Sequence, residues 1–315
     1  MEQKPLVSVV CACYNEEQML PLYYDAMKKQ VLDNLDEYDF ELIFINDGSK
    51  DRTLPILREL AAGDQRVKYL SFSRNFGKEA AMYAGMKHAK GEFACVMDCD
   101  LQDPPEMIGK MLQKLGEDDC DCVATRRVDR KGEPKLRSAF SRAFYRIINR
   151  ISDTEFVDGA RDFRMMRRCV VDAVLELGEY HRFSKGLFMW VGFDTRWLEY
   201  ENVERAAGET KWSFWKLMAY AVEGIVSFST VPLRIATILG SIVSALALVY
   251  MVIRVIIALI WGNPVAGYPS LLAITLCLGG FILLALGIIG EYVARTYMQV
   301  KNRPIYIQKE TNIKD

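Results

Sequence analysis

Short apolar runs alternate with helical patterns through the first part of the chain, residues 1–125. The apolar runs are rich in Val, Ile and Phe and are continuous, which is typical of strands buried on both faces of a parallel sheet. This alternation predicts an α/β domain with a doubly wound, mostly parallel sheet, whose ligands bind beyond the carboxyl ends of the strands. The expected strands are Val7–Cys13, Phe40–Ile45, Val67–Phe72, Glu92–Met97 and Cys120–Thr125, and the expected helices are Glu16–Val31, Asp51–Ala62, Glu79–Ala89 and Pro104–Leu115.

Two much longer apolar runs follow in the last third of the chain. Ile235–Trp261 and Ser270–Val293 each contain a single charged residue. About 20 helical residues cross the hydrocarbon core of a bilayer, so the runs predict a hairpin of two transmembrane helices, at residues 233–261 and 269–295. The alternative is a hydrophobic hairpin buried inside a soluble protein, but two runs of this length seldom occur together in soluble folds.

Positive charges flank this pair of runs on one side. Arg234 precedes the first run, and Arg295 and Arg303 follow the second. Cytoplasmic segments next to membrane helices carry an excess of Lys and Arg. We therefore expect the N-terminal domain, residues 1–211, and the C-terminal tail, residues 296–315, to be cytoplasmic.

Two further segments have the composition of helices at a membrane surface. In residues 135–151 apolar positions follow i, i+3, i+4 spacing, and the opposite face carries Lys and Arg side chains. A basic amphipathic helix of this kind lies on an anionic membrane surface, although packing on the domain core is the alternative. Residues 212–230 are rich in aromatic side chains and predict a juxtamembrane helix that leads into the first span.

Composition excludes some classes of function. The 40 Lys and Arg residues and 41 Asp and Glu residues give a formal net charge of -1, so no nucleic-acid partner is expected. The chain has eight cysteines and two histidines, with neither the C-x-x-C spacing nor the neighbouring histidines of a zinc site. The first residues lack a cleavage-like site of a signal peptide. We therefore expect most cysteines to be reduced core residues.

Acidic residues follow the fourth expected strand directly. Asp98, Asp100 and Gln102 alternate along the chain, and alternate residues of an extended segment point the same way. Oxygen ligands of this kind suit Mg²⁺ or Mn²⁺, which can bridge a nucleotide diphosphate. A spaced pair of acids is a weak signal in an ordinary loop, but its position between a strand and the helix that opens at Pro104 favours a metal site.

Other expected strands also end in polar residues. Tyr14 and Glu16 follow the first strand and Asp47 follows the second, although each could serve only as a turn residue or helix cap. Basic residues at such positions can bind phosphate groups, although most surface cations are merely solvated. The basic residues lie in Ser73–Glu79, Arg126–Arg127, Arg161–Arg164 and Arg205–Lys211.

Seven motifs together resemble those of glycosyltransferase family 2. Within that family the chain is similar to the bacterial polyprenyl-phosphate (bactoprenol) glucosyltransferases and, more distantly, to the dolichol-phosphate mannose synthases. The Q-x-x-R-W signature of processive polysaccharide synthases is absent. The motifs are YNEE (14–17), INDGS (45–49), RNFGKEAA (74–81), MDCDLQDPPE (97–106), RDFRMM (161–166), W-x-G-F (190–193) and AAGETKWSF (206–214).

The resemblance implies a cytoplasmic GT-A catalytic domain at residues 1–211 and a role for each matching residue. Asp162 is expected near the transferred sugar, and Asp162 and Asp100 are the expected catalytic residues. The chain departs from its relatives at Cys99, where alanine or glycine is common, and at Ala160-Arg161, where the turn is usually smaller. The expected nucleotide-binding residues are Tyr14, Glu16, Asp47 and Asp98; the metal ligands are Asp98, Asp100 and Gln102; and the phosphate- or acceptor-binding residues are Arg126, Arg205 and Lys211.

The function implied by the resemblance is inverting transfer of a sugar from a nucleotide donor to polyprenyl (undecaprenyl) phosphate at the cytoplasmic face of the inner (plasma) membrane. The resemblance favours glucose from a UDP-sugar over a GDP-linked donor, with N-acetylglucosamine, mannose and aminoarabinose as alternatives. A processive or soluble-acceptor transferase, and a non-catalytic membrane module, are the other readings. Small residues spaced along both apolar runs, such as Gly240 and Ser244, are compatible with a packed hairpin or a homo-oligomer in the lipid bilayer.

Overall fold

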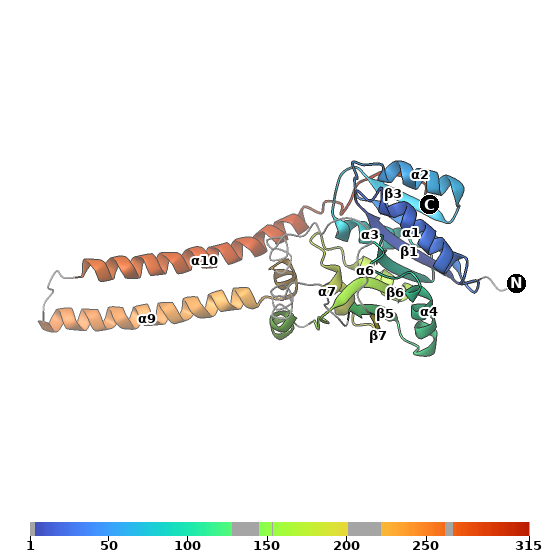
Figure 1. Cartoon of the computed structure of the whole chain (residues 1–315). Coiled ribbons are helices and arrows are strands. Elements are labelled where there is room, and N and C mark those ends of the chain that lie inside the picture. Colours follow the sequence, from blue (N-terminus) through green and yellow to red (C-terminus); the bar gives the residue numbers. More distant parts are fainter. Residues whose placement is uncertain (1–3, 128–144, 153, 201–221, 262–266, 315) are drawn as a thin grey trace. The chain divides into compact units, whose positions relative to one another are not determined.

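The structure is a computed structural model that describes residues 4–127, 145–152, 154–200, 222–261 and 267–314. The chain forms two compact units (Figure 1). Residues 1–224 and 303–315 make up the first unit, which contains the sheet, and residues 225–302 make up the second, which contains two long helices.

An eight-stranded mixed sheet forms the centre of the first unit, in the order β7-β5-β6-β4-β1-β2-β3-β8. The strands β4, β1, β2 and β3 are parallel to one another, whereas β6 is antiparallel to both β4 and β5, and β8 is antiparallel to β3. The α/β class and the parallel centre agree with the sequence prediction, and the antiparallel ladders are additional. The strands are β1 (Leu6–Cys13), β2 (Asp39–Asn46), β3 (Val67–Phe72), β4 (Phe93–Asp98), β5 (Cys122–Arg127), β6 (Ala160–Arg167), β7 (Thr195–Tyr200) and β8 (Gln308–Thr311).

Helices cover both faces of the sheet, which explains why the central strands are apolar on both sides. On β1, Val7, Val9 and Cys11 face a core formed with α1, α2 and α4, whereas Val10 faces a second core formed with α3 and α6. Alternate residues of a strand point to opposite faces, so a strand between two cores needs a continuous apolar run. The helices of this unit are α1 (Met19–Met27), α2 (Thr53–Gly63), α3 (Lys78–His88), α4 (Met107–Glu117), α6 (Arg168–Glu176) and α7 (Ser184–Trp190).

The end of the chain returns to the first unit as an edge strand. β8 pairs with β3, with Ser71 opposite Glu310. The Arg58 Nε donates to Glu310 Oε1 at 2.8 Å, and the Tyr69 hydroxyl donates to the same oxygen at 2.7 Å. Residues 296–315 were predicted only as a C-terminal tail, and the sequence QKET of β8 carries no apolar alternation. The strand is held by its backbone ladder and by these polar side chains instead.

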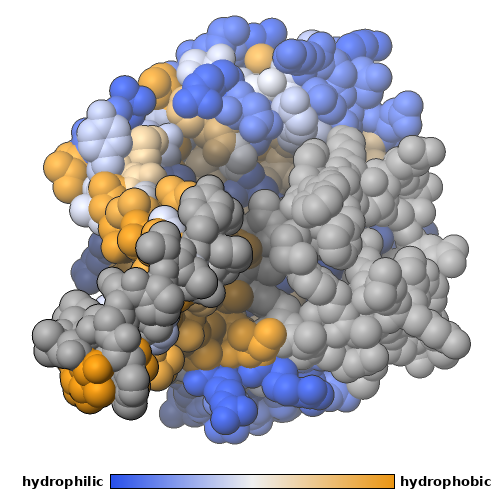
Figure 2. Space-filling model, turned by 90° about the vertical axis from the view of Figure 1, so that its left-hand side faces the viewer, coloured by the Kyte–Doolittle hydropathy of each residue, from blue (hydrophilic) through white to orange (hydrophobic). Residues whose placement is uncertain are grey.

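The second unit contains α9 (Val231–Trp261) and α10 (Tyr268–Val300). By length and composition each is able to cross a membrane, through Val231–Tyr250 in α9 and Cys277–Val300 in α10. None of the most apolar stretch of either helix is buried, and hydrophobic side chains form exposed areas in the space-filling view from the side of the hairpin (Figure 2).

Side-chain hydrogen bonds join the base of the hairpin within the second unit. The Tyr292 hydroxyl donates to the Ser229 carbonyl oxygen at 2.6 Å, and the Arg295 Nη1 donates to Ser227 Oγ at 2.8 Å. α10 continues to Val300, five residues beyond the expected end of the second span, and it contains Arg295, one of the cations that follow the apolar run.

The two expected membrane-surface helices lie largely outside the described residues. Of the segment 135–151, the structure describes residues 145–151, which are helical, and Ile148 there is fully buried. Of the segment 212–230, it describes residues 222–230, of which 222–228 are helical. The contact of both segments with a membrane surface stays a prediction.

Gly85 provides a test of the close packing between α3 and β1. A Cβ atom added at Gly85 would lie 2.1 Å from Val10 Cγ1, so Gly85→Ala is expected to destabilise the chain by about 1–3 kcal/mol through overpacking. Gly63→Ala is the matched control, because a Cβ there meets nothing within 4 Å and alanine favours a helix. Thermal unfolding of the detergent-solubilised chain should show a lower midpoint for Gly85→Ala only; equal midpoints would contradict this packing.

Candidate active site

The loops that follow β1, β2, β3 and β4 all leave the same edge of the sheet, because these strands are parallel. β6 is antiparallel to β4, so its first residues reach that edge as well. Five of the seven sequence motifs lie in these loops and at the start of β6. The edge therefore gathers residues from five segments that are far apart in the sequence.

Reciprocal hydrogen bonds join the loops after β1 and β2. The Asn15 N–H donates to Ser49 Oγ at 2.9 Å, the Lys50 N–H donates to Asn15 Oδ1 at 2.9 Å, and the Glu16 N–H donates to Thr53 Oγ1 at 2.9 Å. Asn15 has a positive φ of 54°, a conformation that asparagine tolerates better than most residues. The turn at Asn15 fixes the backbone on either side, at Tyr14 and Glu16, the two residues predicted to contact the nucleotide.

Asp47 joins the loop after β2 to the loop after β3. Its carboxylate is almost fully buried and accepts hydrogen bonds from the Phe76 N–H at 2.6 Å and the Gly77 N–H at 3.0 Å. Burial raises the pKa of Asp47, and the two backbone donors and Arg74 oppose that rise. Asp47 was predicted to bind the nucleotide; its position also gives it a structural role in shaping the basic loop, which the sequence did not reveal.

The acidic turn after β4 contains Asp98, Asp100 and Gln102. Asp98 is the last residue of β4, and Asp100, which is 6% exposed, accepts a hydrogen bond from the Gln102 N–H at 3.1 Å. Leu101 between them has a positive φ of 56°, which makes the turn tight. The turn thus keeps two carboxylates and an amide close together in sequence at the edge of the sheet.

Lys78 connects Asp98 to Asp162. Its Nζ lies 2.8 Å from Asp98 Oδ1 and 2.7 Å from Asp162 Oδ2. The three residues come from different elements, the start of α3, the end of β4 and the first half of β6. Burial alone would lower the pKa of Lys78, but the carboxylates of Asp162 and Asp98 raise it, so the ammonium group stays charged. The sequence placed Lys78 only among several basic residues at this edge.

Asp162 is held ionised by its neighbours. Burial acts to raise its pKa, but the ammonium groups of Lys78 and Lys185 outweigh that effect and lower the pKa below its ordinary value. A carboxylate with a lowered pKa is a weak general base. Asp162 is therefore suited to orienting a ligand or stabilising positive charge, more than to removing a proton.

Arg164 supports the backbone on which Asp162 stands. Its guanidinium is fully buried, donates to the Arg161 carbonyl oxygen at 3.1 Å and to the Asp162 carbonyl oxygen at 3.4 Å, and lies 3.9 Å from the centre of the Phe188 ring. A buried charge is costly unless hydrogen bonds and a polarisable neighbour compensate. These contacts give Arg164 a positioning role that the RDFR motif alone did not predict.

Asp103 is another buried acid at this edge. Its Oδ1 accepts a hydrogen bond from the Tyr200 hydroxyl at 2.5 Å and lies 3.3 Å from the Arg161 Nε. Burial raises the pKa of Asp103, and Arg161 opposes the rise. The contacts tie the acidic turn to β6 and β7, and they give a structural function to Arg161.

The predicted phosphate-binding residues are only partly described. Arg126 lies on β5, and its Nε donates to Glu199 Oε1 on the neighbouring β7 at 2.9 Å. This pair is half-exposed, so the guanidinium is open to solvent as well. Arg205 and Lys211 lie outside the described residues, and the phosphate-binding role of all three stays a prediction.

The fold and this edge are those of an α/β enzyme that binds its ligands beyond the carboxyl ends of parallel strands. The chain belongs to glycosyltransferase family 2: the model of that family, described as glycosyl transferase family 2, matches residues 8–175. The predicted family, the GT-A type α/β fold and the class of enzyme, a glycosyltransferase, are confirmed.

Close relatives cover almost the whole chain. The bactoprenol glucosyl transferase derived from prophage SfII in Shigella flexneri is 43% identical over 306 residues, which are 97% of this chain and 98% of that protein. The prophage bactoprenol glucosyl transferase homolog of Escherichia coli K12 is 43% identical over 303 residues, 96% of this chain and 98% of that protein.

More distant similarity extends to solved structures. The glucosyl-3-phosphoglycerate synthase from Mycobacterium tuberculosis, in complex with Mn²⁺, UDP-glucose and phosphoglyceric acid, is 18% identical to this chain. The similarity covers 70% of this chain and 78% of that one, with a TM-score of 0.46.

Glu79, next to Lys78, gives the site a pH-dependent stability. Its carboxylate accepts hydrogen bonds from the Ser184 N–H, at 2.9 Å, and from the Ser184 hydroxyl. Burial, followed by the negative charge of Asp162, raises its pKa from 4.5 to about 7. Because the folded chain holds this proton more tightly than the unfolded chain, the group stabilises the fold below pH 4.5, and this contribution is lost as the pH rises through about 7.

We therefore expect the unfolding midpoint of the wild type to fall between pH 5 and pH 8 relative to that of Glu79→Gln, which cannot titrate. Thermal unfolding of both proteins across this range measures the difference. The exposed Glu59 on α2 provides the control, and Glu59→Gln should follow the wild type. Parallel curves for the wild type and Glu79→Gln would show that Glu79 does not hold this proton.

Proposed function

We propose that this chain transfers glucose from UDP-glucose to polyprenyl (undecaprenyl) phosphate, with inversion at the anomeric carbon, at the cytoplasmic face of the plasma membrane. The observation that carries the proposal is the 43% identity to bactoprenol glucosyl transferases over 97% of the chain, a span that includes both apolar helices as well as the catalytic domain. The paired apolar helices support an acceptor that resides in a bilayer.

The proposed reaction is a single in-line displacement. An oxygen of the lipid monophosphate attacks the anomeric carbon and forms the new C–O bond, while the bond to the nucleoside diphosphate breaks and its electron pair leaves with the diphosphate. A phosphate monoester has a second pKa near ~6, so the acceptor is largely ionised at neutral pH and needs no strong base. The charge state of Asp162 agrees with this chemistry, because its lowered pKa suits orientation of the sugar.

The residues of the acidic turn fit a hard divalent cation, Mg²⁺ or Mn²⁺. The donor set consists of carboxylate and amide oxygens, from Asp98, Asp100 and Gln102, which such cations prefer. A bound cation supplies Lewis-acid stabilisation of the leaving diphosphate. Asp98 already binds a cationic group, the Lys78 ammonium, so its position attracts positive charge.

Lys78 has a positioning role in this proposal. Its ammonium group holds the side chains of Asp98 and Asp162 at the same place, one from the expected cation site and the other from the expected sugar site. In the same proposal Tyr14, Glu16 and Asp47 bind the nucleotide, and Arg126, Arg205 and Lys211 bind phosphate groups.

We infer that the hairpin of α9 and α10 is the membrane anchor, in a multi-pass arrangement with the catalytic domain in the cytoplasm. Arg234 lies in the first turn of α9 and Arg295 lies near the end of α10, and these arginines support this orientation. Homo-oligomers through the hairpin are part of the same proposal. A Cβ added at Gly240, Gly280 or Gly287 would meet nothing within 4 Å, so these helix faces are open to another helix in a single copy.

The reaction can be tested with purified full-length protein in lipid nanodiscs. Undecaprenyl phosphate and, separately, UDP-glucose, UDP-N-acetylglucosamine and GDP-mannose are supplied, and lipid products are read by mass spectrometry. We expect glucosyl phosphoundecaprenol from UDP-glucose. A lipid product carrying another sugar would correct the donor, and sugar transfer only to soluble acceptors would refute the lipid-phosphate proposal.

Asp100→Ala tests the cation site. Asp100 lies in the turn between β4 and α4, outside the sheet and the helices, so the fold should survive the change. Because a metal ion contributes several kcal/mol to such a transfer, turnover with Mg²⁺ or Mn²⁺ should fall about 100-fold or more. Asp118→Ala removes an exposed acid at the end of α4 and should leave turnover unchanged. Undiminished turnover of Asp100→Ala would remove Asp100 from the site.

A further inference from the structure

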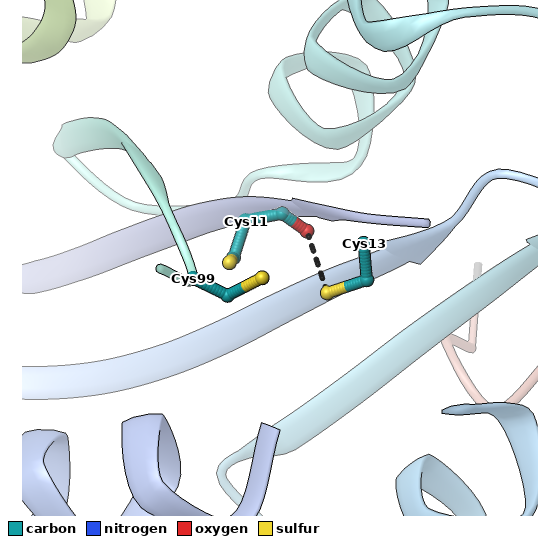
Figure 3. A group of neighbouring side chains, drawn as sticks. All are labelled: Cys11, Cys13 and Cys99. Atoms are coloured by element: carbon teal, nitrogen blue, oxygen red, sulfur yellow. Dashed lines mark hydrogen bonds between the residues drawn. The ribbon is translucent and has the colours of Figure 1, made fainter. Parts of the chain in front are cut away.

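Three cysteine side chains converge below the acidic turn, on the inner side of the sheet edge. Cys11 and Cys13 are alternate residues of β1, and Cys99 follows the last residue of the neighbouring β4. Their sulfur atoms all lie within 4.8 Å of one another (Figure 3). Each side chain is almost fully buried, and none of the three cysteines is part of a disulfide.

The backbone register explains why the three thiols meet. β1 and β4 are parallel, and Ala12 pairs with Asp98, so Cys13 and Cys99 come next on the two neighbouring segments. Cys11 and Cys13 point to the same face because they are two residues apart on a strand. Their hydrogen bonds are weak: Cys13 Sγ lies 3.9 Å from the Cys11 carbonyl oxygen, and Cys99 Sγ lies 3.8 Å from the Ala12 carbonyl oxygen.

A buried tyrosine provides an independent observation at the same place. Tyr23 of α1 is fully buried, and within the described part of the chain its hydroxyl has no hydrogen-bond partner. Tyr23 packs in the same hydrophobic core as Cys11, Cys13 and Cys99. A buried hydroxyl without a hydrogen-bond partner costs free energy. A thiolate that is bound to a cation would give this hydroxyl an acceptor.

We propose that Cys11, Cys13 and Cys99 form a binding site for a soft, thiophilic cation, with monovalent copper as the ion that suits the donor set. Three sulfur ligands at about 2.3 Å from a central ion stand roughly 4 Å apart, so the observed spacing needs only a small adjustment. On binding, each thiol loses its proton to solvent and its sulfur forms a bond to the cation. A thiolate of the bound site would offer the Tyr23 hydroxyl an acceptor.

The number and type of ligands favour Cu⁺ over Zn²⁺. Zn²⁺ in structural sites takes four ligands, commonly Cys and His, whereas the described residues gather three cysteines here with no histidine or carboxylate in the group. Thiolates without harder ligands select Cu⁺. Ordinary core packing would explain three buried thiols, but it leaves the Tyr23 hydroxyl unexplained.

The site has a short path to solvent and to the acidic turn. Tyr14, the residue after Cys13, is 37% exposed, so a small opening of the loop after β1 admits an ion. Cys99 stands between Asp98 and Asp100, so a cation on its sulfur restrains the turn that carries both carboxylates. We expect Cu⁺ to slow sugar transfer for this reason; this consequence rests on the proposed function, whereas cation binding itself does not.

The test uses the full chain in detergent, reduced and freed of metal, with the exposed thiols removed by Cys169→Ser and Cys277→Ser. Cu⁺ is titrated against a coloured Cu⁺ chelator. This background protein should bind one equivalent of Cu⁺, and its unfolding midpoint should rise with Cu⁺ because the ion binds the folded state. Adding Cys99→Ala should weaken binding about tenfold or more, whereas Cys122→Ala, which removes a buried thiol of β5 outside the cluster, should not.

Three outcomes would overturn the proposal. They are equal binding by the background protein and Cys99→Ala, tighter binding of Zn²⁺ than of Cu⁺, and loss of two titratable thiols without bound copper, which would indicate a disulfide. Tyr23→Phe provides a finer readout, because it should weaken Cu⁺ binding without changing the stoichiometry. The binding assay uses neither donor nor acceptor, so its failure and a failure of the proposed transfer reaction are distinguishable.

Discussion

Two carboxylates from different strands share one ammonium group, and the geometry of the candidate site depends on this link. Lys78 begins α3, Asp98 ends β4 and Asp162 lies on β6, so a single cation joins side chains from three elements at the sheet edge. Without it, the two acids would repel each other in a partly buried place. The surrounding contacts, from Arg164 below Asp162 and from Asp103 to Arg161 and Tyr200, keep the strands at the spacing that the link requires.

Much of the fold could be predicted from the sequence because its signals are local. The runs at Val7–Cys13 and Phe40–Ile45 are apolar throughout, as strands between two helical layers must be, and both are central strands of the sheet. β6 and β8 were not predicted, since Ala160–Arg167 mixes charged and apolar residues and Gln308–Thr311 is polar. Both strands are held by pairing with strands that are distant in the sequence, and a short stretch of sequence carries no signal for such pairing.

The candidate site was predictable in composition but not in connectivity. Parallel strands deliver Asp47 and Asp98 to one edge, so their assembly followed from the order of the motifs. The hydrogen-bond and ion-pair partners of these acids could not be predicted from the motifs. Asp47 binds the Phe76 and Gly77 N–H groups, and Asp98 binds Lys78. The proximity of Cys99 to Cys13 could not be predicted either, because it depends on the register between β1 and β4. Such pairings arise from tertiary structure, which a single sequence motif does not specify.

The strand β8 has a consequence for how the protein is made. It supplies an outer edge of the catalytic sheet, yet it lies after both apolar helices in the chain. During translation β8 is therefore synthesised after the hairpin. Until β8 has been made, the edge of β3 that it covers has no strand partner. Open strand edges invite wrong pairing, and the hairpin is synthesised before residues 303–315 complete the edge of the sheet.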